Sequence, residues 1–190
     1  MIGLNLLSLI ITGNPGVGKH TVAKLVAKKL DLEIIDINKV AIQKGIFEKS
    51  KGTLDVDVKK LKKTLEKLIT KDSVVVGHLA PYVVPRKQVK LAIVLRRDPY
   101  KLISVYKKRG YSHQKSIENL GSETLGVIYY DSINEFGSDR TFQINTTGKS
   151  VSTITKKITN LFAKGTFSED KVDWLGLISK KNDLKRFFPY

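Results

Sequence analysis

The 190-residue chain contains no cysteine and only three histidines, His20, His78 and His113. Without thiols the protein has neither disulfides nor thiolate metal sites. The three histidines are spread along the chain, whereas a structural zinc site needs clustered ligands. We therefore expect no structural zinc, and we assign no metal ligand from the sequence.

Long apolar runs and targeting signals are also missing. No stretch is long enough to cross a bilayer. Residues 1–12 contain no basic segment and no cleavage site, and Leu6 to Thr12 predicts a first buried strand instead of a signal peptide. We expect a cytoplasmic protein with no membrane partner. At 190 residues, 41% hydrophobic and 27% charged, the chain has the composition of one ordinary globular domain.

Acidic residues are scarce, with 18 Asp and Glu against 34 Lys and Arg, which gives a net charge of +16. The excess is mostly lysine and includes a dense patch at Lys59, Lys60, Lys62, Lys63, Lys67 and Lys71. Such a surface attracts polyanions without sequence selectivity, which favours RNA or proximity to the ribosome. A general lysine bias of the proteome, linked to composition or temperature, is the alternative explanation.

One glycine-rich segment carries the clearest chemistry, and it reads Gly13-Asn14-Pro15-Gly16-Val17-Gly18-Lys19-His20-Thr21. It lies between an apolar run and an amphipathic run, the order of a strand, a phosphate-binding loop and a helix. Glycines let backbone N–H groups converge on phosphate oxygens, and the helix N-terminus adds its dipole. Lys19 can place a point charge on the outer phosphates. The segment predicts binding of a nucleoside triphosphate.

The residue after the loop lysine departs from the general motif. A Ser or Thr at this position normally ligates Mg²⁺ through its hydroxyl, but this chain has His20 followed by Thr21. Imidazole is a softer ligand than Mg²⁺ prefers. We expect the phosphate loop to be intact and the coordination of Mg²⁺ to be unusual.

The rest of the chain alternates strand and helix patterns, which predicts a parallel sheet with right-handed crossovers. After the first strand we expect four more, at Leu32–Ile37, Ser73–Val76, Val89–Leu95 and Thr141–Asn145. Helices are expected after the glycine loop over Val22–Leu30, from Asp55 and Asp57, from Asp98 to Arg109, over about 113–135, and over Val151–Phe162. Residues 38–54 predict a short helix and an irregular segment.

Several later motifs, in this order and spacing, resemble the small nuclear-type adenylate kinases within the nucleoside monophosphate kinases. They are Val74-Val75-Val76-Gly77-His78, Val94-Leu95-Arg96-Arg97-Asp98, Lys108-Arg109-Gly110-Tyr111-Ser112 and Glu118-Asn119. Archaeal members of that family carry an Asp-Trp-Leu signature in the tail, which Asp173-Trp174-Leu175 matches. The resemblance covers residues 8 to about 175.

The resemblance implies a P-loop NTPase fold of the α/β class, with three α/β/α layers, a five-stranded parallel sheet and a short lid. It divides the chain into a kinase-like domain at 1–165 and a tail at 166–190. The monophosphate-binding segment would lie near 37–57 and the lid near 108–118. The implied reaction is transfer of the γ-phosphoryl of ATP to AMP, with ATP hydrolysis in some members and a link to small-ribosomal-subunit maturation. The implied partners are therefore AMP, a small-subunit ribosomal protein and rRNA.

Site residues follow from the loop and from the resemblance together. Cofactor binding is assigned to Gly13, Gly16, Gly18, Lys19, His20, Thr21, Arg109 and Lys149. The catalytic residues are Lys19, Arg109 and His78. The resemblance assigns Lys149 to the adenine side. Thr147-Gly148-Lys149-Ser150 lacks the upstream glycine of a second phosphate loop, but it follows the last strand, where ligands of such sheets bind.

Arginine is rare in this lysine-rich chain, so its positions are informative. A guanidinium can bind phosphate through two hydrogen bonds at once, which favours a phosphate-binding role for Arg109. Arg96 and Arg97 follow a strand, and either contacts phosphate or pairs with Asp98. His78 ends a central strand, where an imidazole can orient water or move a proton, or can simply bond to backbone.

A second departure bears on catalysis. Where the family usually has an acidic residue two positions before His78, this chain has Val76, so Asp36 is the nearest remaining carboxylate. Mg²⁺ can still arrive bound to ATP with its own waters. The alternative function is a nucleotide-gated ribosome-assembly factor with little or no kinase turnover. A kinase for another small alcohol or monophosphate is the third reading.

Overall fold

A five-stranded parallel sheet forms the centre of the computed structural model, which describes residues 8–50, 53–69, 72–165 and 168–189. The strand order is β2-β5-β1-β6-β7. The strands are β1 (Ser8–Thr12), β2 (Glu33–Asp36), β5 (Ser73–Val76), β6 (Val89–Arg96) and β7 (Thr141–Asn145). The predicted α/β fold with five parallel strands is confirmed. Leu6 and Leu7 of the first predicted strand lie outside the described residues.

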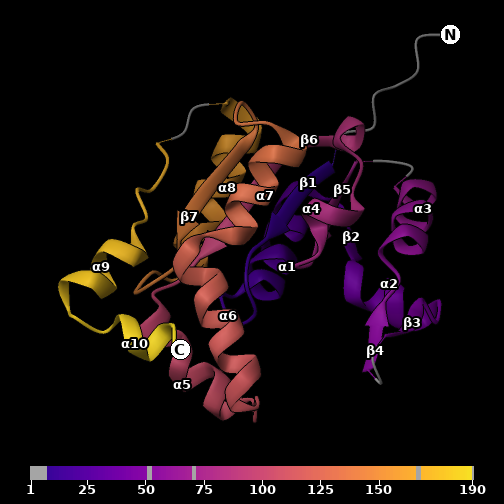
Figure 1. Cartoon of the computed structure of the whole chain (residues 1–190). Helices are drawn as coiled ribbons and strands as arrows, with labels where there is room; N and C mark the ends of the chain where they lie inside the picture. Colours follow the sequence, from indigo (N-terminus) through magenta and orange to yellow (C-terminus); the bar gives the residue numbers. More distant parts are fainter. Residues whose placement is uncertain (1–7, 51–52, 70–71, 166–167, 190) are drawn as a thin grey trace, which may run out of the picture.

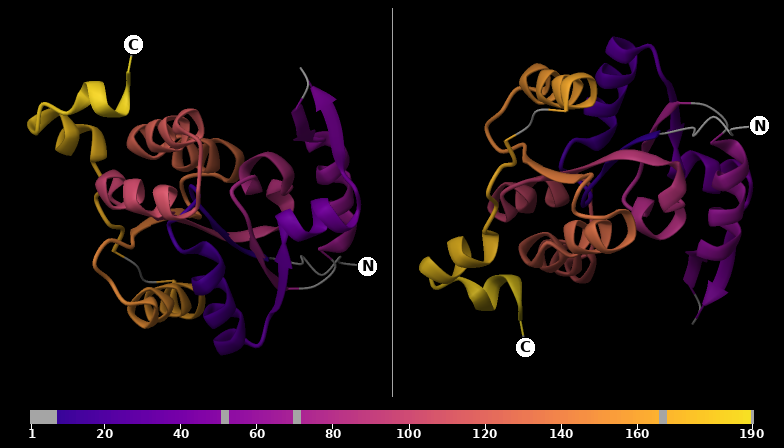
Figure 2. Two further views of the ribbon diagram at one scale, coloured as in Figure 1. Left: turned by 90° about the horizontal axis from the view of Figure 1, so that it is seen from below. Right: turned by 90° about the horizontal axis from the view of Figure 1, so that it is seen from above.

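Helices cover both faces of this sheet and make three layers (Figures 1 and 2). One face carries α1 (Lys19–Leu30) and α8 (Val151–Lys164), and the other carries α3 (Val58–Leu68), α4 (Ala80–Val83) and α7 (Val127–Phe136). Every residue of β1 is buried, and alternate side chains point to opposite faces of the sheet. Leu9 and Ile11 join the α1 and α8 cluster, while Ile10 joins the other.

The region predicted as one helix over 113–135 is two helices, so that prediction is wrong. α6 (His113–Leu125) ends at Gly126, and α7 begins directly after it. Gly126 has a φ of +70°, a left-handed conformation that glycine adopts without strain. A Cβ there would lie 3.1 Å from the Arg96 guanidinium. The break therefore depends on glycine, because another residue would be strained there and its Cβ would lie against Arg96.

Residues 38–54 are more regular than expected. After α2 (Ile37–Gln43), β3 (Phe47–Ser50) and β4 (Thr53–Val56) pair as an antiparallel hairpin, with Phe47 opposite Val56. Asp55 therefore lies in a strand and does not open the next helix. Asp57 does, because its carboxylate accepts the Lys60 N–H at 2.9 Å as the N-cap of α3. The hairpin was missed because each strand has only four residues, and β3 has a single apolar residue, Phe47.

β2 differs from the buried strand that was predicted. Among the described residues it pairs only with β5, which leaves it at the edge of the sheet. Glu33 and Ile34 are exposed, and Ile35 and Asp36 are half-buried. One short helical turn, η1 (Arg86–Gln88), and α4 were not predicted.

Helix α5 (Pro99–Lys108) follows the predicted start, because Asp98 accepts the Tyr100 N–H at 2.8 Å. The last elements, α9 (Trp174–Lys180) and α10 (Leu184–Phe187), pack against α6 at one end of the molecule (Figure 1). Phe187 is fully buried and meets Tyr100 edge-on, with ring centroids 5.0 Å apart. The hairpin and α3 lie at the opposite end of the molecule.

The segment before α9 covers the other edge of the sheet. Glu169 accepts the Gln143 N–H at 2.9 Å, and Asp170 accepts the Asn145 N–H at 2.9 Å. Two backbone donors of β7 are therefore satisfied by carboxylates. Within the described part of the chain, no helix has the length and apolar character needed to span a bilayer.

Candidate active site

The glycine-rich loop lies between the end of β1 and the start of α1, as predicted from its sequence context. Gly13 has a φ of +128°, and a Cβ there would lie 2.3 Å from the Leu95 carbonyl oxygen. Gly16 has a φ of +89° and rests against Leu102 and Val105 of α5. These two glycines let the loop turn closely beneath β6 and α5, which no other residue permits. Gly13 therefore sets the shape of the loop where the loop passes close to β6.

A cavity of about 370 Å³ opens over this loop. It brings together most of the residues assigned from the sequence, because the ends of parallel strands meet at one edge of the sheet. The lining residues are Pro15, Gly16, Gly18, Lys19, His20, Thr21, Asn38, His78, Arg109, Tyr111, Lys115 and Asn119. Gly13 and Lys149 are the two assigned residues that do not line it.

Lys19 is the most buried cation of the cavity, with 6% of its surface exposed. Its Nζ donates to the Asn14 carbonyl at 2.8 Å. Burial, and next the positive charge of Arg109, lower the pKa of Lys19 to about 7. An anion in the cavity would favour the charged ammonium again, so Lys19 is poised to respond to phosphate.

The start of α1 faces the same cavity. Gly18 occupies the N-cap position and has no side chain with which to bond the first helical N–H groups. These donors and the helix dipole are suited to phosphate oxygens. Positive charge is thus concentrated at the cavity by the backbone N–H groups and by Lys19, Arg109 and Lys115.

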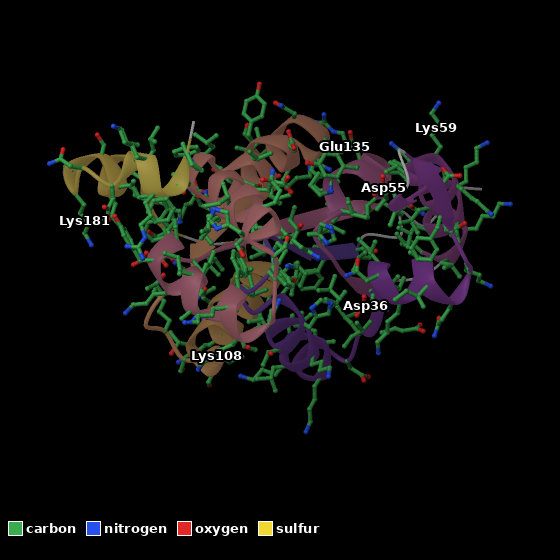
Figure 3. The ribbon with its side chains drawn as sticks, turned by 60° about the horizontal axis from the view of Figure 1, so that its bottom comes forward. Asp36, Asp55, Lys59, Lys108, Glu135 and Lys181 are labelled. Atoms are coloured by element: carbon green, nitrogen blue, oxygen red, sulfur yellow. The ribbon has the colours of Figure 1, made fainter. Side chains whose placement is uncertain are left out.

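His20 contacts the carboxylate that the sequence singled out. Its Nε2 lies 3.2 Å from Asp36 Oδ2, and the His20 side chain is 47% exposed. Burial lowers the pKa of His20 below its usual value, and the Asp36 charge opposes that shift. Asp36 Oδ1 also accepts the N–H groups of Asn38 and Lys39 at 3.1 and 3.2 Å, which caps α2. Figure 3 shows Asp36 between α1 and α2.

These contacts bear on how Mg²⁺ could be held. In the described part of the chain no three His, Cys, Asp or Glu side chains gather in a metal-binding group. Both Asp36 oxygens already have partners, and the Thr21 hydroxyl is the oxygen donor nearest in sequence to Lys19. The donor set fits a Mg²⁺ ion held mainly by nucleotide phosphates and water, with few protein ligands.

His78 lies at the cavity end of β5, directly after Gly77. Burial, and next the charge of Lys19, lower its pKa to about 4. The imidazole is therefore neutral near pH 7. At neutral pH it can accept or donate a hydrogen bond, but its low pKa makes it a weak base for proton transfer.

Arg109 ends α5 as its C-cap residue, and Gly110 follows with a φ of +65°. The Arg109 side chain is exposed yet lines the cavity, beside Tyr111, whose ring stacks on Tyr106 at 5.3 Å. The turn thus holds one guanidinium at the mouth of the cavity. From the same turn onward, α6 contributes Lys115 and Asn119.

The sequence interpretation missed the residues that hold the loop. Glu123 of α6 is fully buried, and its Oε2 accepts the Asn14 amide at 2.9 Å. Its Oε1 accepts the Arg96 Nε at 2.8 Å. Arg96 therefore pairs with Glu123 and not with Asp98, while Arg97 donates to the Gly16 carbonyl at 3.2 Å. The available signal was a strand-end arginine that needs a buried acid, but nothing in the sequence pointed to Glu123 as that acid.

Lys149 lies elsewhere in the structure. It precedes α8, and its Nζ donates to Asp170 at 2.8 Å. The neighbouring Thr147 hydroxyl accepts the Asp98 N–H at 2.8 Å. This segment therefore ties the β7 end to the α5 start and to the tail.

Two more hollows continue from the site along α2 and α3. One, of about 440 Å³, shares His20 with the loop cavity and follows β2 and α2 through Lys24, Asp36 and Lys39. The next, of about 390 Å³, is lined by Lys44, Lys60, Lys63, Thr64, Lys67 and Leu68. Because Lys44 and Leu68 line both hollows, the surface from His20 to α3 is one concave, lysine-rich region.

Comparisons with known proteins agree with this geometry. The profile of the AAA domain family matches residues 9–126. A protein of Thermococcus kodakarensis named "Putative adenylate kinase" is 34% identical over 158 residues, which cover 83% of this chain and 86% of that protein. A protein of the same name from Pyrococcus furiosus is 36% identical, and the match covers 83% of this chain and 84% of that protein. Another, from Saccharolobus solfataricus, is 30% identical, with 88% of this chain and 87% of that protein covered.

Solved structures support the fold. A shikimate kinase from Acinetobacter baumannii, in complex with shikimate, has a TM-score of 0.59 and 16% identity, and covers 86% of this chain and 96% of its own. A shikimate kinase from Aquifex aeolicus has a TM-score of 0.51 and 19% identity. The match covers 84% of this chain and 97% of that kinase. At these identities the likeness concerns the fold alone.

Proposed function

Because this chain belongs to the AAA domain family and to the family of its archaeal relatives, we propose that it is an adenylate kinase. It transfers the γ-phosphoryl group of ATP to AMP and releases two ADP. The observation that carries the proposal is the cavity over the glycine loop, which Lys19, Arg109 and Lys115 all line. Phosphoryl transfer needs positioning and positive charge more than covalent chemistry, and this cavity supplies both.

Each lining group has a distinct role in the proposed reaction. Gly16, Gly18 and the first N–H groups of α1 bind the phosphates of ATP, and Lys19 neutralises the outer ones. Arg109 stabilises the charge that spreads over the migrating group. His78, neutral at pH 7, orients water or a phosphate oxygen by a hydrogen bond. Mg²⁺ bound together with ATP would neutralise phosphate charge, and His20 stands where a hydroxyl ligand is usual.

The acceptor side is assigned to the segment near 37–57. Asn38 already lines the loop cavity, and the 440 Å³ hollow continues from His20 along α2. The lid is assigned to residues near 108–118, because Arg109, Tyr111 and Lys115 line the cavity from that turn. We retain the division into a domain at 1–165 and a tail at 166–190. Lys149 remains the weakest proposed contact, since it pairs with Asp170.

A test of the reaction is ADP formation by the purified protein with ATP, Mg²⁺ and one acceptor at a time. AMP should be the best acceptor among AMP, GMP, CMP and UMP, with two ADP formed per ATP consumed. ADP and free phosphate formed without an acceptor would identify an ATPase, which some proteins of the resembled family are. Faster turnover with a non-nucleotide alcohol such as shikimate would contradict the proposal.

A second function is favoured by the lysine-rich concave region. Lys44, Lys60, Lys63 and Lys67 line it, and Lys71 of the predicted patch lies outside the described residues. This surface supports a polyanionic partner, and we propose rRNA with a neighbouring small-subunit ribosomal protein. In the alternative function the protein is a nucleotide-gated assembly factor in small-subunit maturation, with little turnover.

Charge reversal separates the two functions. The pair Lys63→Glu and Lys67→Glu should weaken binding of a small-subunit rRNA fragment and leave ADP formation intact. A matched pair on α1, Lys28→Glu and Lys29→Glu, removes the same charge from an exposed surface elsewhere. Equal loss of RNA binding in both pairs would mean that net charge, and not this region, attracts RNA.

A further inference from the structure

Trp174, the only tryptophan of the chain, reaches the carboxylate that holds the phosphate loop. Its indole Nε1 donates to Glu123 Oε1 at 3.1 Å. The same oxygen accepts from Arg96 Nε at 2.8 Å and from the Arg97 N–H at 3.1 Å. Glu123 is fully buried, and Trp174 is 9% exposed. A tail residue thus supplies one of the donors that fix a buried charge.

The other side of this carboxylate reaches the ATP site in two further bonds. Glu123 Oε2 accepts the Asn14 side-chain amide at 2.9 Å, and Ser122 donates to the Asn14 amide oxygen at 3.0 Å. The Asn14 carbonyl in turn accepts the Lys19 ammonium at 2.8 Å. Asn14 is 4% exposed, so its position in the loop is fixed by these contacts.

Helix α6 carries the middle of this chain of bonds and also lines the loop cavity. Its first half contributes Lys115 and Asn119 to the loop cavity. Its second half carries Ser122 and Glu123, and α9 and α10 pack against it. Figure 1 shows α6 between α1 and α10. A movement of α6 at the cavity must therefore be accommodated at Trp174.

From these contacts we infer that Trp174 is a positioning residue for the phosphate loop, and that docking of α9 and binding of ATP are coupled through Glu123. The inference rests on the proposed ATP site. Three donors hold Glu123 Oε1 in one orientation, and loss of the indole N–H loosens that orientation and with it the Asn14 amide. The coupling is reciprocal, because a tail that strengthens ATP binding is itself held more firmly when ATP is bound.

The first test compares Trp174→Phe with the protein itself. Phenylalanine keeps an aromatic ring in the packing but removes the N–H donor. We expect the ATP dissociation constant, measured by calorimetry, to rise about fivefold, at the lower end of usual coupling. Leu175→Ala is the matched control, since Leu175 is the next residue and is 43% exposed. It should leave ATP affinity unchanged.

A thermal unfolding curve separates positioning from simple loss of stability. A positioning role requires weaker ATP binding at temperatures where Trp174→Phe is fully folded. If Trp174→Phe lowers the melting temperature but keeps the ATP affinity of the unaltered protein, Trp174 only packs the tail, and the inference is wrong. If the unaltered protein itself does not bind ATP, the proposed function fails first, and the two failures are thereby distinguished.

The second test uses the fluorescence of Trp174 in the unaltered protein. Since Trp174 is the sole indole, its emission reports this one hydrogen bond and its surroundings. We expect ATP to change the emission saturably, with the same midpoint as calorimetry. An emission that stays constant while calorimetry shows saturation with ATP would overturn the coupling.

Discussion

The two sides of the nucleotide cavity are built in opposite ways. On the α6 side, Asn14, Arg96 and Glu123 are each at most 4% exposed and share one hydrogen-bonded network. On the α2 side, a single contact of 3.2 Å joins His20 to Asp36, and the His20 side chain is 47% exposed. The α6 side therefore holds the glycine loop in place, whereas the α2 side leaves space for ligands in two adjoining hollows.

The contrast shows how one site can be fixed and accessible at once. Removing one partner of a buried ion pair leaves an unpaired charge and costs about 3–5 kcal/mol. An exposed pair contributes about 0–1 kcal/mol, because water and salt screen it. We therefore expect substitutions on the α6 side to damage the fold, and substitutions on the α2 side to act on ligands.

Glu123→Gln should have the largest effect on stability. Glutamine keeps the shape but leaves the Arg96 guanidinium buried without its charged partner, so the free energy of unfolding should fall by about 3–5 kcal/mol. Denaturant unfolding measures this change. Glu135→Gln is the control, because Glu135 pairs with Lys62 at 3.7 Å on the surface. This substitution should lower the free energy of unfolding by under about 1 kcal/mol. Equal losses in both variants would remove the proposed contrast.

Arg109→Ala should have the largest effect on catalysis. Arginines that contact the transferred phosphoryl group contribute about 10³ or more to kcat, so a loss of that order is expected in AMP-dependent ADP formation. The neighbouring Lys108 projects from the surface, and Lys108→Ala serves as the control (Figure 3). A similar kcat for the two variants would show that the cavity charge at Arg109 is not used.

Much of the fold and of the glycine loop could be predicted from the sequence, because these features depend on residues that are neighbours in the chain. The glycine loop, the Asp98 and Asp57 caps and the apolar strands are specified by neighbouring residues. The Glu123 network was not predictable, since it joins residues 27 and 109 positions apart. The helix break at Gly126 has a local cause, a left-handed glycine, but Gly121 lies within the same α6 and does not break it, so glycine alone does not mark the position.

The ATP affinity should depend on pH through Lys19. In the free protein its pKa is about 7, so above pH 7 the ammonium is largely deprotonated, and phosphate must restore the proton. Affinity should therefore fall as pH rises above about 7, by up to tenfold per pH unit. Calorimetry in two buffers of different ionisation enthalpy should record proton uptake above pH 7. Absence of uptake at pH 8 would contradict the lowered pKa.

Asp36→Asn should have the smallest effect on stability. Asparagine can still cap α2, and the lost contact with His20 is partly exposed, so the free energy of unfolding should change by under about 1 kcal/mol. Without the Asp36 charge the pKa of His20 should fall further. NMR titration of His20 and denaturant unfolding check the two expectations. A loss of about 3 kcal/mol would place Asp36 in a network as firm as that of Glu123.

One titration tests the central claim that the glycine-loop cavity binds ATP. The ATP dissociation constant is measured for the protein, for Lys19→Ala and for Lys24→Ala, whose side chain lines only the neighbouring hollow. Lys19→Ala should weaken ATP binding by about tenfold or more, the value of a charge-assisted hydrogen bond. Lys24→Ala should bind ATP as the unaltered protein does. Full ATP affinity in Lys19→Ala would contradict the placement of the site.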